Sequence, residues 1–330
     1  MSRSTKNMVK TCGALIFIIT LFFLSFWAIL QNNTFSKNID ASNPNNPINK
    51  MLKIDHSAGI QDYAIYNHEL GKGSYSRVLL AKNIKTLEWL AVKIQPYSDP
   101  EDIQHEIKQL SLLGDYRDDT IVTDQKQKTH YLFMRLTQGT AVEKLYEDNL
   151  QHSTEELFNI IISSFYALQA LHQKNIVHND IHEGNLIYNP SNKKSQWVDM
   201  AFSLKLKQKD TIYPLKRINK NPAFCYNAPE STRQRGYATD MYQLGFMSLR
   251  LLLIFSEENS ELREKYIDSR EYSFNTLKEK QKMLLSTTSS EPTKNILSLL
   301  YRMIDSNAEK RPTLEEATRE FNANYNTLKL

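Results

Sequence analysis

Hydrophobic and polar positions divide the chain into three parts. Residues 11–31 carry no charge and contain the apolar run GALIFIITLFFLSFWAIL, which is close to the roughly 20 residues that one bilayer-spanning helix needs. Residues 32–60 are rich in Asn, Ser and Pro and show no hydrophobic period. From about residue 61 short apolar runs alternate with amphipathic stretches. The pattern predicts a transmembrane helix at residues 11–31, a flexible linker at residues 32–60 and a globular region after them.

The first part of the globular region, residues 61–139, reads mainly as strands. The runs YAIYNHEL, SRVLLAKNI, EWLAVKIQ and HYLFMRL are short, apolar and rich in β-branched or aromatic residues. One amphipathic helix interrupts them, because apolar side chains recur at helical spacing at Ile103, Ile107, Leu110 and Leu113. We expect a small β-rich lobe here.

The larger remainder, residues 140–330, reads mainly as helix. Its clearest start signal is a capping box, in which Ser153 is followed three residues later by Glu156 and then by an apolar run. The two parts together predict an α+β fold, with a small β-rich lobe followed by a larger helical lobe.

The charges beside the apolar segment predict its orientation. Arg3, Lys6 and Lys10 lie in the basic N-terminal tail, residues 1–10, and little charge directly follows the segment. By the positive-inside rule the N-terminus stays cytoplasmic and the globular region crosses the membrane. A cleaved signal peptide and a buried core helix are the alternatives. The bulky residues at the end of the run argue against cleavage.

The composition of the whole chain excludes several classes of protein. Its 330 residues suffice for one large domain or two small ones, and its apolar content of 41% is that of a globular protein. A net charge of +4 is too weak to suggest nucleic-acid binding. The two cysteines, Cys12 and Cys225, allow no disulfide framework, which favours a reducing compartment.

The densest cluster of reactive side chains is HNDIHEGNL, residues 178–186. In it, Asp180 can accept a proton from an attacking hydroxyl group, and Asn185 can hold a cation on phosphate oxygens. This interpretation predicts a second carboxylate after the next hairpin, and QWVDMAF supplies Asp199 there. The alternatives are a metal site built on His178 and His182, and a simple polar turn.

Two motifs upstream suit nucleotide binding. GKGSYSRV, Gly71–Val78, lies between two predicted strands, where glycines let the backbone approach a phosphate. A hairpin glycine pair is the alternative. Lys93 in LAVKIQ has neighbours that favour burial, so it needs an acidic partner, and Glu106 on the following helix is the candidate. The alternative is an edge-strand lysine with a solvated glutamate.

From about residue 63 to 320 the chain resembles the eukaryotic-type protein kinase domain. The glycine-rich loop and AVKI come first, HNDIHEGN stands for H-R-D-x-K-x-x-N, and DMA stands for D-F-G. Further along, YNAPE contains Glu230, TDMYQLG contains Asp240 and KRPT contains Arg311. The resemblance implies that Arg311 forms a buried pair with Glu230. It also implies that Asp240 anchors the backbone of the 178–186 loop.

The resemblance implies a bilobal kinase fold and transfer of the γ-phosphoryl group of ATP to a hydroxyl group, with Mg²⁺ as the metal. The implied catalytic residues are Asp180, Lys93 and Glu106, and the implied metal ligands are Asn185 and Asp199. The implied ATP contacts come from both lobes: Gly71, Gly73, Ser74, Val78, Ala91, Lys93, Met134, Leu136, Asn185 and Asp199.

Departures from the family pattern affect the expected substrate and activity. Asn179 replaces the arginine that couples the loop to a phosphorylated activation segment, and His182 replaces the lysine that steadies the γ-phosphate in serine/threonine kinases. Met200 and Ala201 replace Phe-Gly. A pseudokinase scaffold is one alternative, and a sugar or lipopolysaccharide kinase with a small hydroxyl substrate is another. Those sugar-type relatives commonly lack A-P-E and the KRP arginine, so a serine/threonine protein substrate is favoured.

The charge between Asp199 and Glu230 suggests a partner. This segment has one acidic residue, Asp210, against Lys205, Lys207, Lys209, Lys216, Arg217 and Lys220. It can attract an acidic substrate or membrane head groups, and a solvated basic loop is the alternative. Because the reaction needs ATP, the crossing orientation requires a lumen that contains ATP. In a bacterium, either the orientation is reversed or the protein is exported and its helix inserts in a host-cell membrane.

Overall fold

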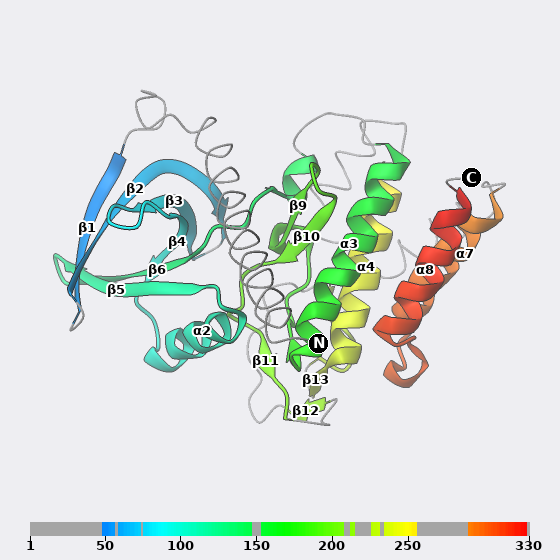
Figure 1. The fold of residues 1–330 in the computed structure, drawn as a ribbon. Helices are drawn as coiled ribbons and strands as arrows, with labels where there is room; N and C mark the ends of the chain where they lie inside the picture. The colour runs from blue at the N-terminus through cyan, green and yellow to red at the C-terminus, as the bar shows by residue number, and fades with distance from the viewer. Residues whose placement is uncertain are drawn as a thin grey trace, which may run out of the picture. The chain divides into compact units, whose positions relative to one another are not determined.

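The computed structural model describes residues 48–56, 59–73, 75–146, 153–207, 212–214, 226–231, 234–255 and 290–328 (Figure 1). The chain forms two compact units. Of the described residues, those from 48 to 97 and from 117 to 136 form the first unit, and those from 98 to 116 and from 137 onward form the second. The predicted transmembrane helix at residues 11–31 lies outside the described residues. Within the described ranges, no helix is long and apolar enough to cross a membrane.

The first unit is built on a six-stranded antiparallel sheet with the strand order β1-β2-β3-β4-β6-β5. Alternating side chains of these strands bury an apolar cluster that includes Ile65, Leu79, Val92 and Phe133, as the two-residue period of a strand requires. The predicted β-rich lobe is therefore present. Its strands are β1 (Ile48–His56), β2 (Gly59–Lys72), β3 (Arg77–Asn83), β4 (Trp89–Pro96), β5 (Tyr116–Asp124) and β6 (Gln127–Arg135).

Strand β1 corrects the predicted linker at residues 32–60. Its residues pair with β2, from Ile48 opposite Tyr66 to His56 opposite Gly59. Leu52 and Ile54 are buried while the residues between and beside them are exposed. The period is that of a half-buried strand. This alternation covers only a few residues and follows an Asn- and Pro-rich stretch, so the sequence alone did not indicate a strand here.

The two edge strands of the sheet meet through side chains. Lys50 on β1 donates a hydrogen bond to the hydroxyl group of Tyr131 on β6, at 3.0 Å. His56 on β1 lies 2.9 Å from the carboxylate of Asp118 on β5, which also accepts a hydrogen bond from Tyr63 at 2.7 Å. Because β1 and β5 are the outermost strands, these contacts close the curled sheet around its apolar interior.

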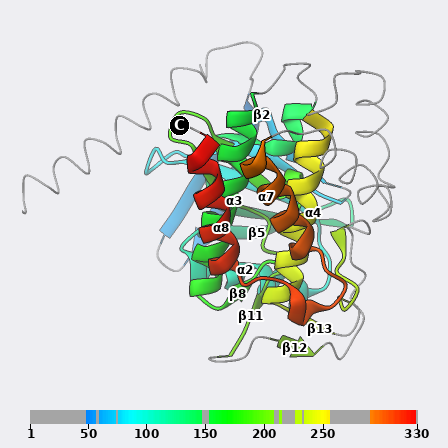
Figure 2. The same cartoon turned by 90° about the vertical axis from the view of Figure 1, so that its right-hand side faces the viewer.

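The second unit is mainly helical. Figure 2 shows α3, α4, α7 and α8 packed side by side, in agreement with their contacts. The helices are α2 (Pro100–Leu113), α3 (Thr154–Gln173), α4 (Tyr237–Phe255), α7 (Glu291–Met303) and α8 (Leu314–Leu328). Between them lie short strands and turns: β7 (Thr140–Ala141), η1 (Val142–Tyr146), β8 (Ile176–Val177), η2 (Glu183–Asn185), β9 (Leu186–Asn189), β10 (Lys194–Trp197), β11 (Leu204–Lys205), β12 (Ile212–Pro214), β13 (Gln234–Gly236) and η4 (Ala308–Lys310).

The predicted helix starts and faces are present. The hydroxyl oxygen of Ser153 accepts a hydrogen bond from the backbone N–H of Glu156 at 3.2 Å and caps α3. On α2, Ile103 and Leu110 are buried as predicted, whereas Ile107 and Leu113 are only partly buried. Glu106 is buried on the same side as Ile103 and Leu110. His105 of α2 also contacts the carbonyl group of Ser203, at 2.7 Å, so the helix is tied to the segment that follows Asp199.

Gly139 gives a testable consequence for stability. Its φ of +126° is one that only glycine adopts readily, and an added Cβ would lie 2.4 Å from the carbonyl oxygen of Tyr188. Gly139→Ala is therefore expected to destabilise the protein by at least about 2 kcal/mol, measured as a lower midpoint in urea unfolding. Gly71→Ala is the matched control, because its Cβ would meet no atom within 4 Å. Equal midpoints for the two variants would contradict this reading of Gly139.

Candidate active site

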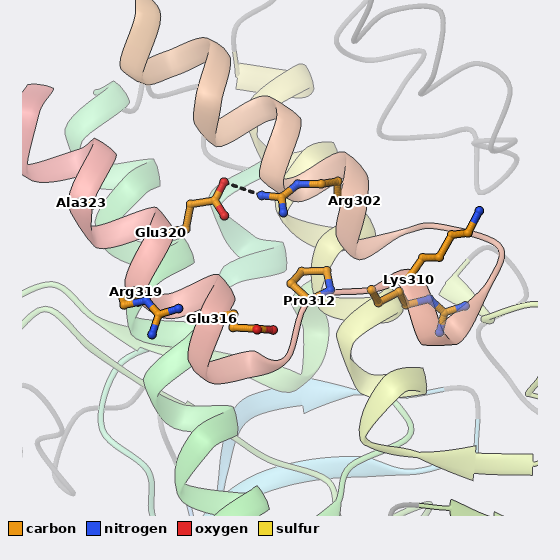
Figure 3. Close-up of a pocket in the computed structure, with 8 residues that line it drawn as sticks. Arg302, Lys310, Pro312, Glu316, Arg319, Glu320 and Ala323 are labelled. Carbon is orange, nitrogen blue, oxygen red and sulfur yellow. Dashed lines mark hydrogen bonds and ion pairs between the residues drawn. The ribbon is translucent and has the colours of Figure 1, made fainter.

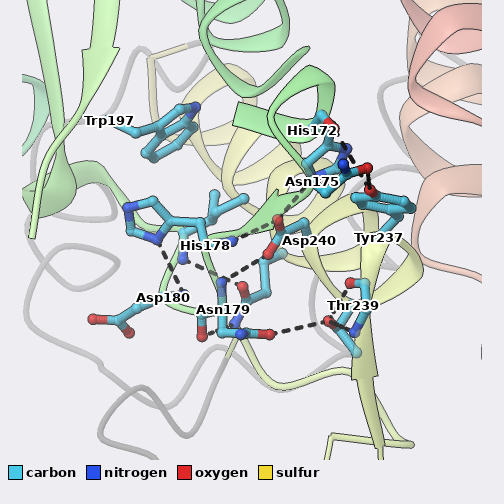
Figure 4. A network of polar contacts seen from close by, with 12 residues as sticks. His172, Asn175, His178, Asn179, Asp180, Trp197, Tyr237, Thr239 and Asp240 are labelled. Carbon is cyan, nitrogen blue, oxygen red and sulfur yellow. Dashed lines mark hydrogen bonds and ion pairs between the residues drawn. The ribbon is translucent and has the colours of Figure 1, made fainter. Parts of the chain in front are cut away.

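The 178–186 loop is anchored to the first turn of helix α4. The backbone N–H groups of His178 and Asn179 each donate to the carboxylate of Asp240 at 2.8 Å, and the ring of His172 approaches the same carboxylate at 2.9 Å (Figure 4). Asp240 is completely buried. A buried carboxylate needs such donors, so the anchoring role expected for Asp240 is confirmed.

Gln243 is a second anchor that the sequence reading missed. It lies one turn after Asp240 on α4, on the same side of the helix. Its carboxamide oxygen accepts from the N–H of Ile181 at 3.3 Å, and its nitrogen donates to the carbonyl group of Asn179 at 3.1 Å. The loop backbone is thereby held on both sides of Asp180. The spacing of three residues from Asp240 was the available signal.

Asp180 is held with one oxygen engaged and one left over. The side-chain nitrogen of Asn185 donates to the backbone carbonyl and to Oδ2 of Asp180, both at 2.9 Å. Oδ1 is buried and accepts no hydrogen bond. The carboxylate points away from Asp240 (Figure 4). A fixed, unsatisfied carboxylate oxygen is suited to accept a proton from a hydroxyl group brought to it.

His178 is a positioning group and not a metal ligand. Its Nδ1 accepts the N–H of Asp180 at 3.3 Å, and its Nε2–H donates to the carbonyl group of Val198 at 3.0 Å. Burial lowers the pKa of His178, which agrees with a neutral ring. With both nitrogens engaged, the histidine metal site considered for this loop is wrong. In the described part of the chain, no group of three or more His, Cys, Asp or Glu could hold a metal.

The loop and Asp199 are joined through backbone. The N–H of Val198 donates to the carbonyl group of Asn185 at 2.9 Å, so the residue before Asp199 is fixed to the end of the loop. Asp199 has a φ of 61°, a left-handed conformation that Asp and Asn tolerate better than most residues. Since the nitrogen of Asn185 is already used by Asp180, its Oδ1 is the atom left for a cation. One amide and one carboxylate oxygen fit Mg²⁺, which prefers oxygen ligands.

Two residues depart from the family pattern in this loop, and their contacts are neutral or weak. Asn179 donates to the carbonyl group of Phe202 at 3.1 Å and accepts from the hydroxyl group of Thr239 at 3.4 Å. An amide there can bridge segments but cannot attract a phosphate as an arginine does. His182 accepts the N–H of Gly184 with Nδ1, and its Nε2 lies 3.7 Å from Asp180.

In the first unit, sheet register places several predicted ATP contacts beside one another. Gly71 lies opposite Val78, Val78 opposite Lys93, and Ala91 opposite Met134. The backbone N–H of Gly73 closes the glycine-rich turn on the carbonyl group of Ser76, and Ser74 lies outside the described residues. Leu136 packs against the apolar cluster that contains Leu80 and Trp89.

Lys93 and Glu106 are each buried, with 6% and 3% of their surface exposed. They belong to different units, Lys93 to the first and Glu106 to the second. Buried charges require partners, as the sequence reading assumed. The pairing of one with the other stays a prediction.

The expected pair of Arg311 and Glu230 is confirmed. The two terminal nitrogens of the Arg311 guanidinium group, Nη1 and Nη2, donate to the two carboxylate oxygens of Glu230 at 2.6 and 2.9 Å, which is a bidentate arrangement. Arg311 also donates to the carbonyl groups of Ala238 and Asp305. The A-P-E segment, the start of α4 and the turn before α8 are thereby tied together.

Glu183 supports the loop in a way that the sequence reading missed. It is 3% exposed, and its carboxylate accepts hydrogen bonds from Arg250 on α4, at 3.0 Å, and from the hydroxyl group of Tyr226. Arg250 and Tyr226 also contact each other at 2.8 Å. Arg250 and Tyr226 lie 67 and 43 residues from Glu183 in the sequence, so no local pattern could have identified them as its partners.

A pocket of about 590 Å³ lies elsewhere in the second unit, between α7, η4 and α8 (Figure 3). None of the predicted site residues lines it. Arg302 and Glu320 form an ion pair across it. The residues that line it are Arg302, Lys310, Arg311, Pro312, Glu316, Arg319, Glu320 and Ala323. Most of these lining residues are charged, and none of them belongs to the 178–186 loop.

Comparison with known proteins agrees with this geometry. Residues 65–321 match the family model described as protein kinase domain. The chain is 27% identical over 214 residues to calcium-dependent protein kinase 5 of Plasmodium berghei, covering 59% of the chain and 37% of that protein. It is 24% identical over 298 residues to the human hormonally up-regulated neu tumor-associated kinase, covering 84% of the chain and 39% of that protein. A titin homolog of Caenorhabditis elegans is 27% identical over 204 residues, 58% of the chain and 1% of that protein. The chain thus spans well under half the length of these relatives.

Proposed function

The chain belongs to the protein kinase family, and from this premise we propose that it is an active kinase that phosphorylates serine or threonine residues of a protein. The observation that carries the proposal is the state of Asp180. Its carboxylate is fixed by Asn185 and keeps one oxygen without a hydrogen bond. A scaffold without catalysis has no need for an unsatisfied buried acceptor, which costs free energy.

In the proposed reaction the protein contributes position and charge. Asp180 Oδ1 accepts the proton of the acceptor hydroxyl group as the hydroxyl oxygen bonds to the γ-phosphorus of ATP. The bond from that phosphorus to the β–γ bridging oxygen breaks, and ADP leaves. Asn185 and Asp199 would hold Mg²⁺, which when bound neutralises phosphate charge. Asp240 and Gln243 keep the loop backbone fixed, so little reorganisation accompanies the reaction. Lys93 is proposed to contact the phosphates, with Glu106 as its partner.

A protein acceptor is supported by the Arg311–Glu230 pair, which holds the A-P-E segment in place. A small-molecule kinase is the second candidate, because His182 stands where serine/threonine kinases have lysine. A pseudokinase is the third. Assays with a protein acceptor and with free sugars separate the first two, and the absence of transfer to both would support the third.

Removal of the divalent cation tests the reaction itself. With radiolabelled ATP and a mixed protein acceptor, we expect label transfer in Mg²⁺ and only background transfer when EDTA exceeds the metal. The reason is that Asn185 is neutral and Asp199 is negative, so the positive charge that offsets the phosphates has to come from the cation. Added Mg²⁺ should restore it. Transfer that persists in excess EDTA would contradict the proposed metal ligands. Absence of transfer under all conditions would contradict an active kinase.

We further propose that residues 11–31 tether the kinase to a membrane whose kinase-facing side contains ATP. The support is the uncharged apolar run preceded by basic residues. Protease treatment of intact vesicles tests the orientation, because a domain inside is protected until detergent is added. A full-length chain that washes off membranes in salt and carbonate would end the proposal.

A further inference from the structure

Arg235 is a buried arginine whose Nε has no hydrogen-bond acceptor among the described residues. It lies in β13, only 4% exposed, and its Nε is enclosed with no hydrogen-bond acceptor. No ion pair or hydrogen bond joins its side chain to any other described residue. Two other arginines of the second unit differ from Arg235 in this respect, because Arg311 forms an ion pair with Glu230 and Arg250 forms one with Glu183.

Arg235 adjoins the Asp180 loop. The next residue, Gly236, donates its N–H to the hydroxyl oxygen of Thr239 at 3.0 Å, and that hydroxyl group approaches the side chain of Asn179 at 3.4 Å. Asn179 directly precedes Asp180. Burial lowers the pKa of Arg235, and the negative charge of Asp180 acts in the opposite direction. The guanidinium group therefore lies within the electrostatic reach of the proposed base.

Arg235 also lies beside the activation segment, residues 199–230. In the β12–β13 pair, Arg235 stands opposite Tyr213, which belongs to the segment between Asp199 and Glu230. In a kinase this segment faces the acceptor. A guanidinium group stays charged at all physiological pH values, and a buried charge with no carboxylate bonded to it costs free energy. An anion supplied by a ligand would remove that cost.

We propose that Arg235 binds an acidic side chain of the protein that is phosphorylated, and so selects serine or threonine residues flanked by Asp or Glu. The proposal rests on the proposed function. Without Arg235, an acidic acceptor would be repelled by the Asp180 carboxylate. With it, the acceptor's negative charge is paired beside the base. A protein segment is favoured over a small phosphorylated acceptor because Arg235 lies in a strand that pairs with the activation segment.

Matched peptides test the proposal. One carries serine among alanines and another carries the same serine flanked by aspartates. The wild-type protein is expected to phosphorylate the acidic peptide with at least about tenfold higher kcat/KM, the usual range for a buried charge pair. In Arg235→Gln the ratio of kcat/KM for the acidic peptide to kcat/KM for the neutral peptide should fall to about one. Arg319→Gln, which changes an exposed arginine in the pocket of Figure 3, is the control and should keep the preference.

A binding experiment makes the result independent of catalysis. Fluorescence anisotropy with the same peptides, serine replaced by alanine, measures affinity for each variant. Wild-type binding that favours the acidic peptide, lost in Arg235→Gln, supports the proposal even if no phosphate is transferred. Absence of transfer refutes only the proposed function. If Arg235→Gln fails to fold, Arg235→Lys decides, since a lysine keeps the charge but loses the planar fork and should weaken the preference several-fold.

Three outcomes would overturn the proposal. The first is equal binding of acidic and neutral peptides by the wild-type protein. The second is a preference that survives unchanged in a folded Arg235→Gln or Arg235→Lys variant. The third is a dependence on Arg235 seen only with inorganic phosphate or a sugar phosphate, which would assign the residue to a small anion instead of an acidic protein.

Discussion

An Asp199→Asn variant is expected to transfer phosphate at least about a thousandfold more slowly than the parent chain, because a metal ligand contributes several kcal/mol of charge stabilisation to the transition state. The fold should be unchanged. Asp199 is partly exposed, and the hydrogen bond that it accepts from the N–H of Ala201 at 3.3 Å can also be accepted by an amide oxygen. Single-turnover transfer of radiolabel measures the rate, and circular dichroism checks the fold.

Comparison with Asp180→Asn separates the two proposed roles. Loss of a general base lowers rates by about 10²–10⁴-fold, so Asp180→Asn is also expected to be nearly inactive. It should still bind Mg-ATP, seen as a rise in melting temperature, whereas Asp199→Asn should show a much smaller rise. Asp124→Asn, an exposed acid at the end of β5, is the control for the same chemical change. Parent-like transfer by Asp199→Asn would refute its assignment as metal ligand.

The second large effect concerns stability. Arg311→Met is expected to destabilise the protein by about 3–5 kcal/mol, because it leaves the carboxylate of Glu230 in a mostly buried site without its bidentate partner. At about 2–4 °C per kcal/mol for domains of this size, the melting temperature should fall by about 10 °C. Differential scanning calorimetry measures the shift.

The exposed pair of Arg302 and Glu320 supplies the matched control. Its side chains are 48% and 39% exposed, against 1% and 15% for Arg311 and Glu230. Arg302→Met should therefore cost no more than about 1 kcal/mol. Adding Glu230→Met to Arg311→Met should recover part of the loss, since no uncompensated charge then remains. A similar small loss for Arg302→Met and Arg311→Met would show that the buried pair contributes little.

The parts of this structure that could be predicted from sequence are those with a local pattern. The start of α3 follows from a hydroxyl group three residues before a glutamate, and the buried side of α2 follows from apolar spacing. The Asp180 loop was found because proton acceptor and cation ligand lie five residues apart in one loop. The pair of Arg311 and Glu230 depended on the family resemblance, because 81 residues separate its members.

The parts that could not be predicted depend on contacts between distant residues. Glu183 gave no sign of its partners, because Arg250 lies 67 residues away on α4. Arg235 had no local pattern that set it apart from a surface arginine, since burial is a property of the folded chain. Strand β1 was not predicted because only two of its side chains, Leu52 and Ile54, are apolar and buried. Two positions are too few to reveal the alternating pattern of a strand in an Asn- and Pro-rich stretch.

Strand β1 affects how this protein can be handled. Similarity to the family begins at residue 65, inside β2 and after the whole of β1. A recombinant fragment trimmed to that residue would lack Lys50 and His56, so Tyr131 and Asp118 would lose the groups that bond to them. Loss of β1 would also expose the edge of β2 and part of the apolar core of the sheet, and an exposed strand edge promotes self-association. Fragments intended for crystallisation or assay should retain Ile48 and everything after it.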